Sequence, residues 1–71
     1  MFTLTIGRKF KDTFGTMSEA IDKFVALRKE AMNNGESTDT FHKAKLKSGK
    51  ETYRVSFNGR VWDKNDNEVT F

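Results

Sequence analysis

The sequence predicts an α+β protein in which one helix packs against an antiparallel β-sheet. Three observations lead to this class. The first segment, "FTLTI", alternates apolar and polar residues, as a strand with one buried face does. The middle of the chain has a helix start signal followed by apolar residues at helical spacing. The last third has alternating runs that meet at Asn58-Gly59, a strong signal for a hairpin.

The composition is that of one small domain spanning residues 1–71. The chain has 71 residues and no cysteine, so neither a disulfide nor a thiolate metal site stabilises it. Hydrophobic residues make up 35% of the sequence, which is enough for a single core weighted toward its seven Phe residues. The net charge of +3 favours an anionic partner only where the positive charges are clustered.

The first half of the chain contains a strand and the helix. The strand covers 2–6, and Gly7 permits a bulge or a turn after it. The pattern leaves open whether 10–14, with Phe10 and Phe14, is a strand or a loop. "TMSE" at Thr16 to Glu19 is a capping box, and Asn34-Gly35 is a typical helix exit. One apolar stripe follows this start signal: Met17, Ala20, Ile21, Phe24, Leu27 and Ala31.

Arg28 interrupts this stripe, because its place on the helical wheel falls among the apolar residues. Either its aliphatic stem lies along the core and its charge reaches solvent, or it binds an anion or a partner.

The second half predicts three consecutive strands over 40–47, 50–57 and 60–63, with a possible short last strand over 68–71. The order is therefore β-α-β-β-β, a curled antiparallel sheet with one helix packed on one face. The first strand pairs either with the last strand or with the strand over 40–47.

Two-residue turns at Ser48-Gly49 and Asn58-Gly59 assign the faces of this sheet, since directly opposed residues share a face. Arg54 then lies opposite Asp63 and is expected to pair with it. The face toward the helix collects His42, Ala44, Leu46, Tyr53, Val55, Phe57, Trp62, Val69 and Phe71. The outer face collects Phe41, Lys43, Lys45, Lys47, Lys50, Thr52, Arg54, Ser56, Val61 and Asp63.

No arrangement of residues indicates catalysis, so we expect a non-enzymatic domain without a cofactor or a small-molecule substrate. His42 is the only histidine and is assigned to the core. "DKNDNE", residues 63–68, has the oxygen spacing of a calcium loop but lacks its Gly and its last Glu, so we expect a polar turn and no metal. No segment has the length and apolarity of a membrane span or of a signal peptide, and the expected location is the cytoplasm.

The basic residues on the outer face are the only feature that suggests a function. Alternate lysines on one strand lie roughly 7 Å apart, close to the spacing of phosphates along a single nucleic-acid strand. The candidate binding residues are Phe41, Lys43, Lys45, Lys47, Lys50 and Arg54, with Phe41 as a surface on which a base stacks.

Three interpretations of these residues stay open. The first is weak, sequence-nonspecific binding of single-stranded nucleic acid, or of an acidic protein. The second is a solvated face whose lysines deter aggregation. The third is a protein-interaction module, such as a small inhibitor or adaptor, that uses a sheet edge or the Phe10/Phe14 segment. Folding of Phe10 and Phe14 over the core of a monomer is favoured over a homodimer.

Overall fold

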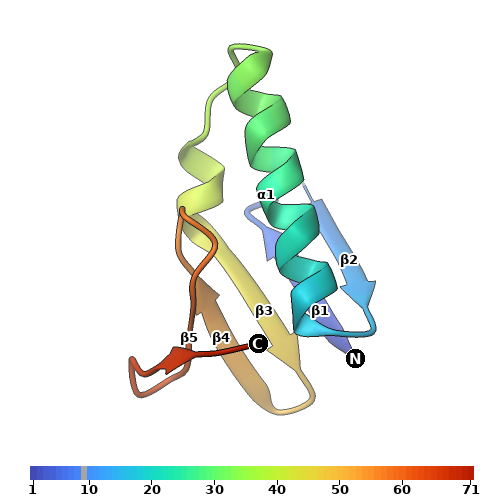
Figure 1. Cartoon of the computed structure of the whole chain (residues 1–71), viewed down its shortest axis with the longest axis vertical. Coiled ribbons are helices and arrows are strands. Elements are labelled where there is room, and N and C mark those ends of the chain that lie inside the picture. The colour runs from blue at the N-terminus through green and yellow to red at the C-terminus, as the bar shows by residue number, and fades with distance from the viewer. Residues whose placement is uncertain (9) are drawn as a thin grey trace.

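The computed structural model of the chain describes residues 1–8 and 10–71 and confirms the α+β class (Figure 1). In this part of the chain, one α-helix packs on a six-stranded antiparallel sheet of order β2-β1-β3-β4-β5-β6. The first strand thus lies beside β3, one of the two neighbours that the sequence left open. The elements are β1 (Phe2–Ile6), β2 (Phe10–Phe14), α1 (Met17–Asn33), η1 (Asp39–Lys43), β3 (Ala44–Ser48), β4 (Glu51–Val55), β5 (Val61–Trp62) and β6 (Glu68–Val69).

The segment 10–14 is a strand, β2, which forms a hairpin with β1. Gly7 has a φ of 56° in the turn between them, a conformation that glycine adopts without steric cost. Phe10 lies opposite Ile6 and Phe14 opposite Phe2. Both phenylalanines pack half-buried against the core and cover one side of it.

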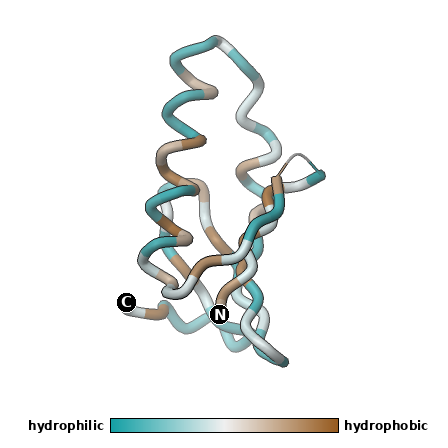
Figure 2. Tube along the Cα trace, turned by 90° about the vertical axis from the view of Figure 1, so that its right-hand side faces the viewer, coloured by the Kyte–Doolittle hydropathy of each residue, from teal (hydrophilic) through white to brown (hydrophobic). Residues whose placement is uncertain are grey.

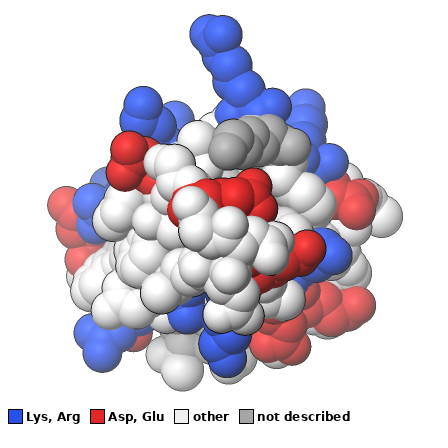
Figure 3. Space-filling model, turned by 90° about the horizontal axis from the view of Figure 1, so that it is seen from above, with Lys and Arg blue, Asp and Glu red and all other residues white. Residues whose placement is uncertain are grey.

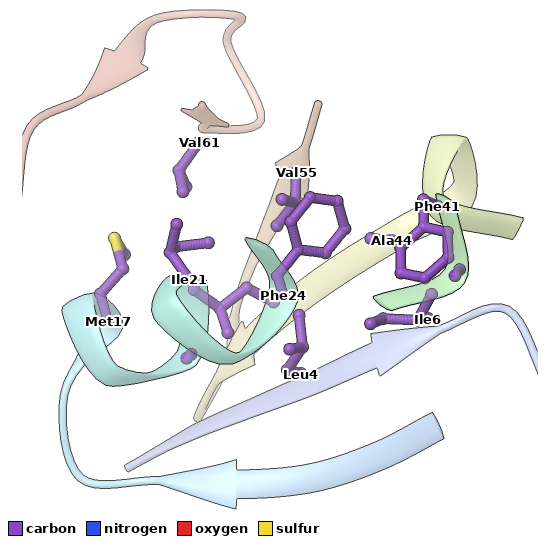
Figure 4. Packing of buried hydrophobic residues seen from close by; sticks show 12 residues of the cluster. Leu4, Ile6, Met17, Ile21, Phe24, Phe41, Ala44, Val55 and Val61 are labelled. Atoms are coloured by element: carbon purple, nitrogen blue, oxygen red, sulfur yellow. The ribbon is translucent and has the colours of Figure 1, made fainter. Parts of the chain in front are cut away.

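The helix agrees with the sequence pattern at both ends. Thr16 is its N-cap, and the Thr16 hydroxyl accepts a hydrogen bond from the Glu19 amide at 3.1 Å. The same hydroxyl donates to the Glu19 carboxylate at 3.1 Å, so the second hydrogen bond of the capping pair joins the two side chains. The predicted stripe faces the sheet, with Leu27 half-buried at its border, and Phe24 lies at its centre with 0% exposure (Figure 4).

The start of the expected strand over 40–47 is wrong, because residues 39–43 form the short 3₁₀-helix η1. A 3₁₀-helix has three residues per turn, which brings Phe41 to the same side as Ala44. Phe41 is therefore buried and meets Phe24 edge-to-face, with 5.7 Å between the ring centroids. His42 is exposed rather than in the core, and it stacks on Phe57 with 4.7 Å between ring centroids.

The β3–β4 hairpin keeps the predicted faces but changes the predicted partners. Leu46 lies opposite Tyr53 rather than Glu51, because the turn consists of Gly49 and Lys50. This difference moves the register by two residues, and a shift of two leaves each side chain on its own face. Ala44 and Leu46 are accordingly buried, as predicted.

The β4–β5 connection has one residue more than predicted, and this reverses the faces of β5. The amide of Ser56 donates to the carbonyl of Arg60 at 2.8 Å, which leaves residues 57–59 as a three-residue loop. Val61 consequently lies opposite Val55 and is fully buried, whereas Trp62 lies opposite Arg54 on the outer face. The predicted places of Val61 outside and Trp62 in the core are both wrong.

The chain ends with the short strand β6, which confirms the possible last strand. Val69 lies opposite Val61 and packs half-buried on the core, while Phe71 is 55% exposed and not in the core as predicted. The Asp63 carboxylate does not pair with Arg54. It accepts hydrogen bonds from the amides of Asn65 and Asn67 and so fixes the polar turn before β6.

The core is formed by residues of α1, η1 and the sheet, and the tube view shows hydrophobic positions along both the helix and the strands (Figure 2). The opposite face of the sheet carries no layer of secondary structure within residues 1–8 and 10–71. Side chains on that outer face are therefore available to a partner.

Candidate nucleic-acid interface

A row of directly opposed residues crosses the outer face of the whole sheet. Each strand contributes one member through the backbone register. From one edge to the other these are Lys11, Thr5, Lys45, Arg54, Trp62 and Glu68. Neighbouring strands lie about 4.8 Å apart, so the side chains of Lys45 and Arg54 leave the outer face next to each other. The register thus brings basic groups and the only tryptophan of the chain together.

A second line of positive charge runs along β3. Lys43 ends η1 just before the strand, Lys45 and Lys47 alternate on the outer face, and Lys50 lies in the turn beyond Ser48. The four lysines are exposed. Figure 3, a view from above, shows Lys and Arg side chains projecting at the upper margin of the molecule. The basic strip, as we call these four lysines together with Arg54, is thus accessible along its length.

Arg54 has two partners on the outer face. Its guanidinium carbon lies 6.0 Å from the centroid of the Trp62 ring, within range of a cation–π contact. One of its nitrogens lies 3.3 Å from a carboxylate oxygen of Asp66. Arg54 and Asp66 are 62% and 80% exposed, so solvent screens this ion pair and it is worth at most about 1 kcal/mol.

Two hollows flank the pair formed by Lys45 and Arg54. On one side Asp63, Lys64 and Asp66 contribute to the lining, so carboxylates accompany the bases. On the other side the lining residues include no carboxylate. We call this second depression the η1 hollow, and its lining residues are Thr5, Gly7, His42, Lys43, Ala44, Lys45 and Arg54.

The six candidate residues therefore fall into an exposed group and one buried residue. Lys43, Lys45, Lys47, Lys50 and Arg54 are exposed along one strip, as the sequence indicates. Phe41 lies in the core, 7% exposed, and offers no surface to a base.

Sequence reasoning missed Trp62 as the aromatic residue of this face. The sequence signal that leaves room for the observed placement is Gly59, since an Asn-Gly pair also occurs in three-residue loops.

The guanidinium of Arg28 makes its contacts within the molecule, with Phe57. One of its guanidinium nitrogens donates to the backbone carbonyl of Phe57, and its guanidinium carbon lies 5.4 Å from the centroid of the Phe57 ring. His42 stacks on the same ring. Arg28 thus supports the β4–β5 loop, a role that the two interpretations from sequence did not include.

Residues 1–8 and 10–71 include no group of three or more His, Asp or Glu side chains arranged to hold a metal ion. None of the helices in these ranges has the length and apolarity needed to cross a membrane.

The architecture defines the class of protein, an α+β domain with one helix on one face of a curled antiparallel sheet and a basic outer face. The chain matches no protein-family model, no curated protein and no solved structure.

Proposed function

We propose that this protein is a non-enzymatic domain that binds single-stranded nucleic acid weakly and without sequence preference through the outer face of its sheet. The observation that supports the proposal most strongly is the sheet register, which places Lys45, Arg54 and Trp62 on adjacent strands of one exposed face. Basic groups for the backbone combined with an aromatic residue for the bases are typical of such proteins. We further propose that it acts as a monomer in the cytoplasm.

The basic strip supplies the contacts to phosphate. Lys45 and Lys47 lie roughly 7 Å apart along β3, and Lys43 and Lys50 extend the line at its two ends. A single strand that follows β3 would have three or four phosphates neutralised. The contacts are to the backbone, and such contacts carry no direct sequence information.

Arg54 and Trp62 supply the contact to a base. Guanidinium planes and aromatic rings both stack on bases, and here the guanidinium lies over the ring. One base stacked on this pair would contribute about 1–3 kcal/mol. A single stacking position keeps the total affinity low.

Charge reversal tests the proposal. The Lys43→Glu, Lys45→Glu double variant should abolish binding of a fluorescently labelled single-stranded oligonucleotide, measured by fluorescence anisotropy at low salt. Both residues are exposed, so the fold should remain intact by circular dichroism. Binding by the unmodified protein should weaken with salt with a log–log slope of about −2 to −3, since three or four phosphates are neutralised.

A matched control uses two lysines on the solvent side of α1. The Lys23→Glu, Lys29→Glu double variant has the same change in net charge, and both residues are exposed. It should retain most of the binding. Equal losses in the two double variants would mean that net charge, and not the basic strip, governs the interaction, and no binding at low salt would refute the proposal.

A protein-interaction module remains the second candidate, because β2 is a five-residue strand at an open edge of the sheet. Two features oppose pairing of a partner strand there. Phe10 and Phe14 already pack against the core. In addition, the Asp12 carboxylate accepts the amide of Thr13 at 2.8 Å, which occupies an edge donor and places a charge beside it. Strong binding to a protein that does not weaken with salt would favour this alternative.

A further inference from the structure

The η1 hollow has a composition that general binding of a nucleic-acid backbone does not require. Three basic residues, Lys43, Lys45 and Arg54, are among its lining residues, together with Thr5 and His42. Along the rest of β3 only Lys47 projects from the outer face. Positive charge is therefore concentrated at one end of the basic strip.

The positive charge at this end of the basic strip exceeds the negative charge of a phosphate within a strand. A phosphodiester within a strand carries one negative charge, whereas a phosphomonoester carries about −1.5 to −2 at pH 7 and has three strong acceptor oxygens. Several cationic donors around one hollow match the second group better, because hydrogen bonds between ionised partners are the strong ones. A hydroxyl such as that of Thr5 can donate to a further oxygen.

The surroundings of the hollow also favour a terminal group. The hollow on the other side of Arg54 includes Asp63 and Asp66 in its lining, which would repel a dianion. The His42 ring is held by stacking on Phe57, which itself contacts Arg28. One wall of the η1 hollow is thus held in position before any ligand binds.

We infer that the η1 hollow binds the terminal phosphomonoester of a nucleic-acid strand, while the rest of that strand follows β3 toward Lys47 and Lys50. This inference rests on the proposed function, because it assumes that the outer face binds a nucleic-acid strand. It adds a preference for one kind of strand end. The site recognises the charge and the oxygens of the phosphate and makes no contact with the bases.

Competition with three oligonucleotides of one sequence tests the inference. The competitors carry a 5′-phosphate, a 3′-phosphate or hydroxyl groups at both ends, and each displaces a labelled strand in an anisotropy assay. One of the phosphorylated strands should compete about tenfold more strongly than the hydroxyl strand. Equal competition by all three would overturn the inference and leave the proposed function standing. Failure of the labelled strand to bind at all would refute both.

Two variants distinguish the hollow from the rest of the strip. Lys43→Gln removes a cation that lines the hollow, so the affinity ratio between phosphorylated and hydroxyl strands should fall to about one. Lys47→Gln removes a cation outside the hollow, so it should weaken all strands and leave the ratio unchanged. A ratio is insensitive to partial unfolding, since both strands meet the same folded fraction. The opposite pattern would overturn the assignment.

A further competition experiment distinguishes the phosphorylated end of a strand from free phosphate as the ligand. Inorganic phosphate and phosphoserine carry the same charged group without a nucleic-acid backbone. They should compete far more weakly than the phosphorylated strand, because they lack the contacts to the rest of the strip. Competition by inorganic phosphate or phosphoserine at the same concentrations as the strand would overturn the identification of the ligand.

Discussion

Truncation of Phe41 distinguishes most sharply between its place in the core and the exposed place that its sequence context suggests. The side chain is 7% exposed and meets Phe24 edge-to-face at 5.7 Å. Removing a buried phenylalanine ring costs about 3–5 kcal/mol, of which the aromatic pair accounts for roughly 1 kcal/mol. A domain of 71 residues has a free energy of unfolding of only about 4–11 kcal/mol. Phe41→Ala should therefore remove a large part of the stability.

Urea unfolding followed by circular dichroism measures this loss. With a slope of about 1 kcal/mol per molar urea, the midpoint should fall by about 3–5 M, or the folded baseline should disappear. Phe71→Ala is the matched control, since Phe71 is 55% exposed and its loss should change stability by no more than about 0.5 kcal/mol. Phe41→Leu should stay folded and bind oligonucleotide like the unmodified protein. Equal midpoints for Phe41→Ala and the unmodified protein would refute the placement of Phe41 in the core.

Three further predictions concern the fold and the charge of the outer face. Val61→Asp should abolish the cooperative thermal transition because it buries an unpaired charge, whereas Trp62→Arg should retain a transition. The reverse result would support the register that a two-residue turn predicts. Gly59→Ala should lower the urea midpoint more than Gly49→Ala. Both positions have a positive φ, but only at Gly59 would the new methyl lie 3.3 Å from a side-chain carbon of Val25. Equal losses would contradict the packing of this loop on α1. Asp66→Asn should raise oligonucleotide affinity about twofold by releasing Arg54, and an unchanged affinity would show that the ion pair does not compete with the ligand.

Local signals were sufficient for the helix. The cap at Thr16 and the apolar stripe depend on residues three and four apart, and these contacts exist in the isolated helix itself. The faces of β3 were also predictable, because a register shift of two residues preserves the alternation of Ala44 and Leu46. Most of the basic strip followed from the same alternation.

Contacts between distant segments determine the two features that the sequence did not predict, the 3₁₀-helix and the length of the β4–β5 loop. Residues 40–43 alternate like a strand, and nothing local reveals that Phe41 packs on Phe24 or that the chain turns as a 3₁₀-helix. The Asn-Gly pair after Phe57 is compatible with loops of two or three residues. Contacts of Phe57 with Arg28 and of Gly59 with α1 accompany the longer loop, and these contacts span at least 29 residues in the chain. The face of Trp62 depends on that single extra residue.

Mapping of the interface by nuclear magnetic resonance tests the central claim most directly. A single-stranded oligonucleotide is titrated into isotope-labelled protein at low salt, and the amide and tryptophan side-chain signals are followed. We predict that the largest shifts occur at Thr5, Lys45, Arg54 and the indole of Trp62, and that they disappear when salt is raised. Shifts confined to α1 or to the edge strand β2, or no shifts at all, would contradict the account of the outer face as a nucleic-acid interface.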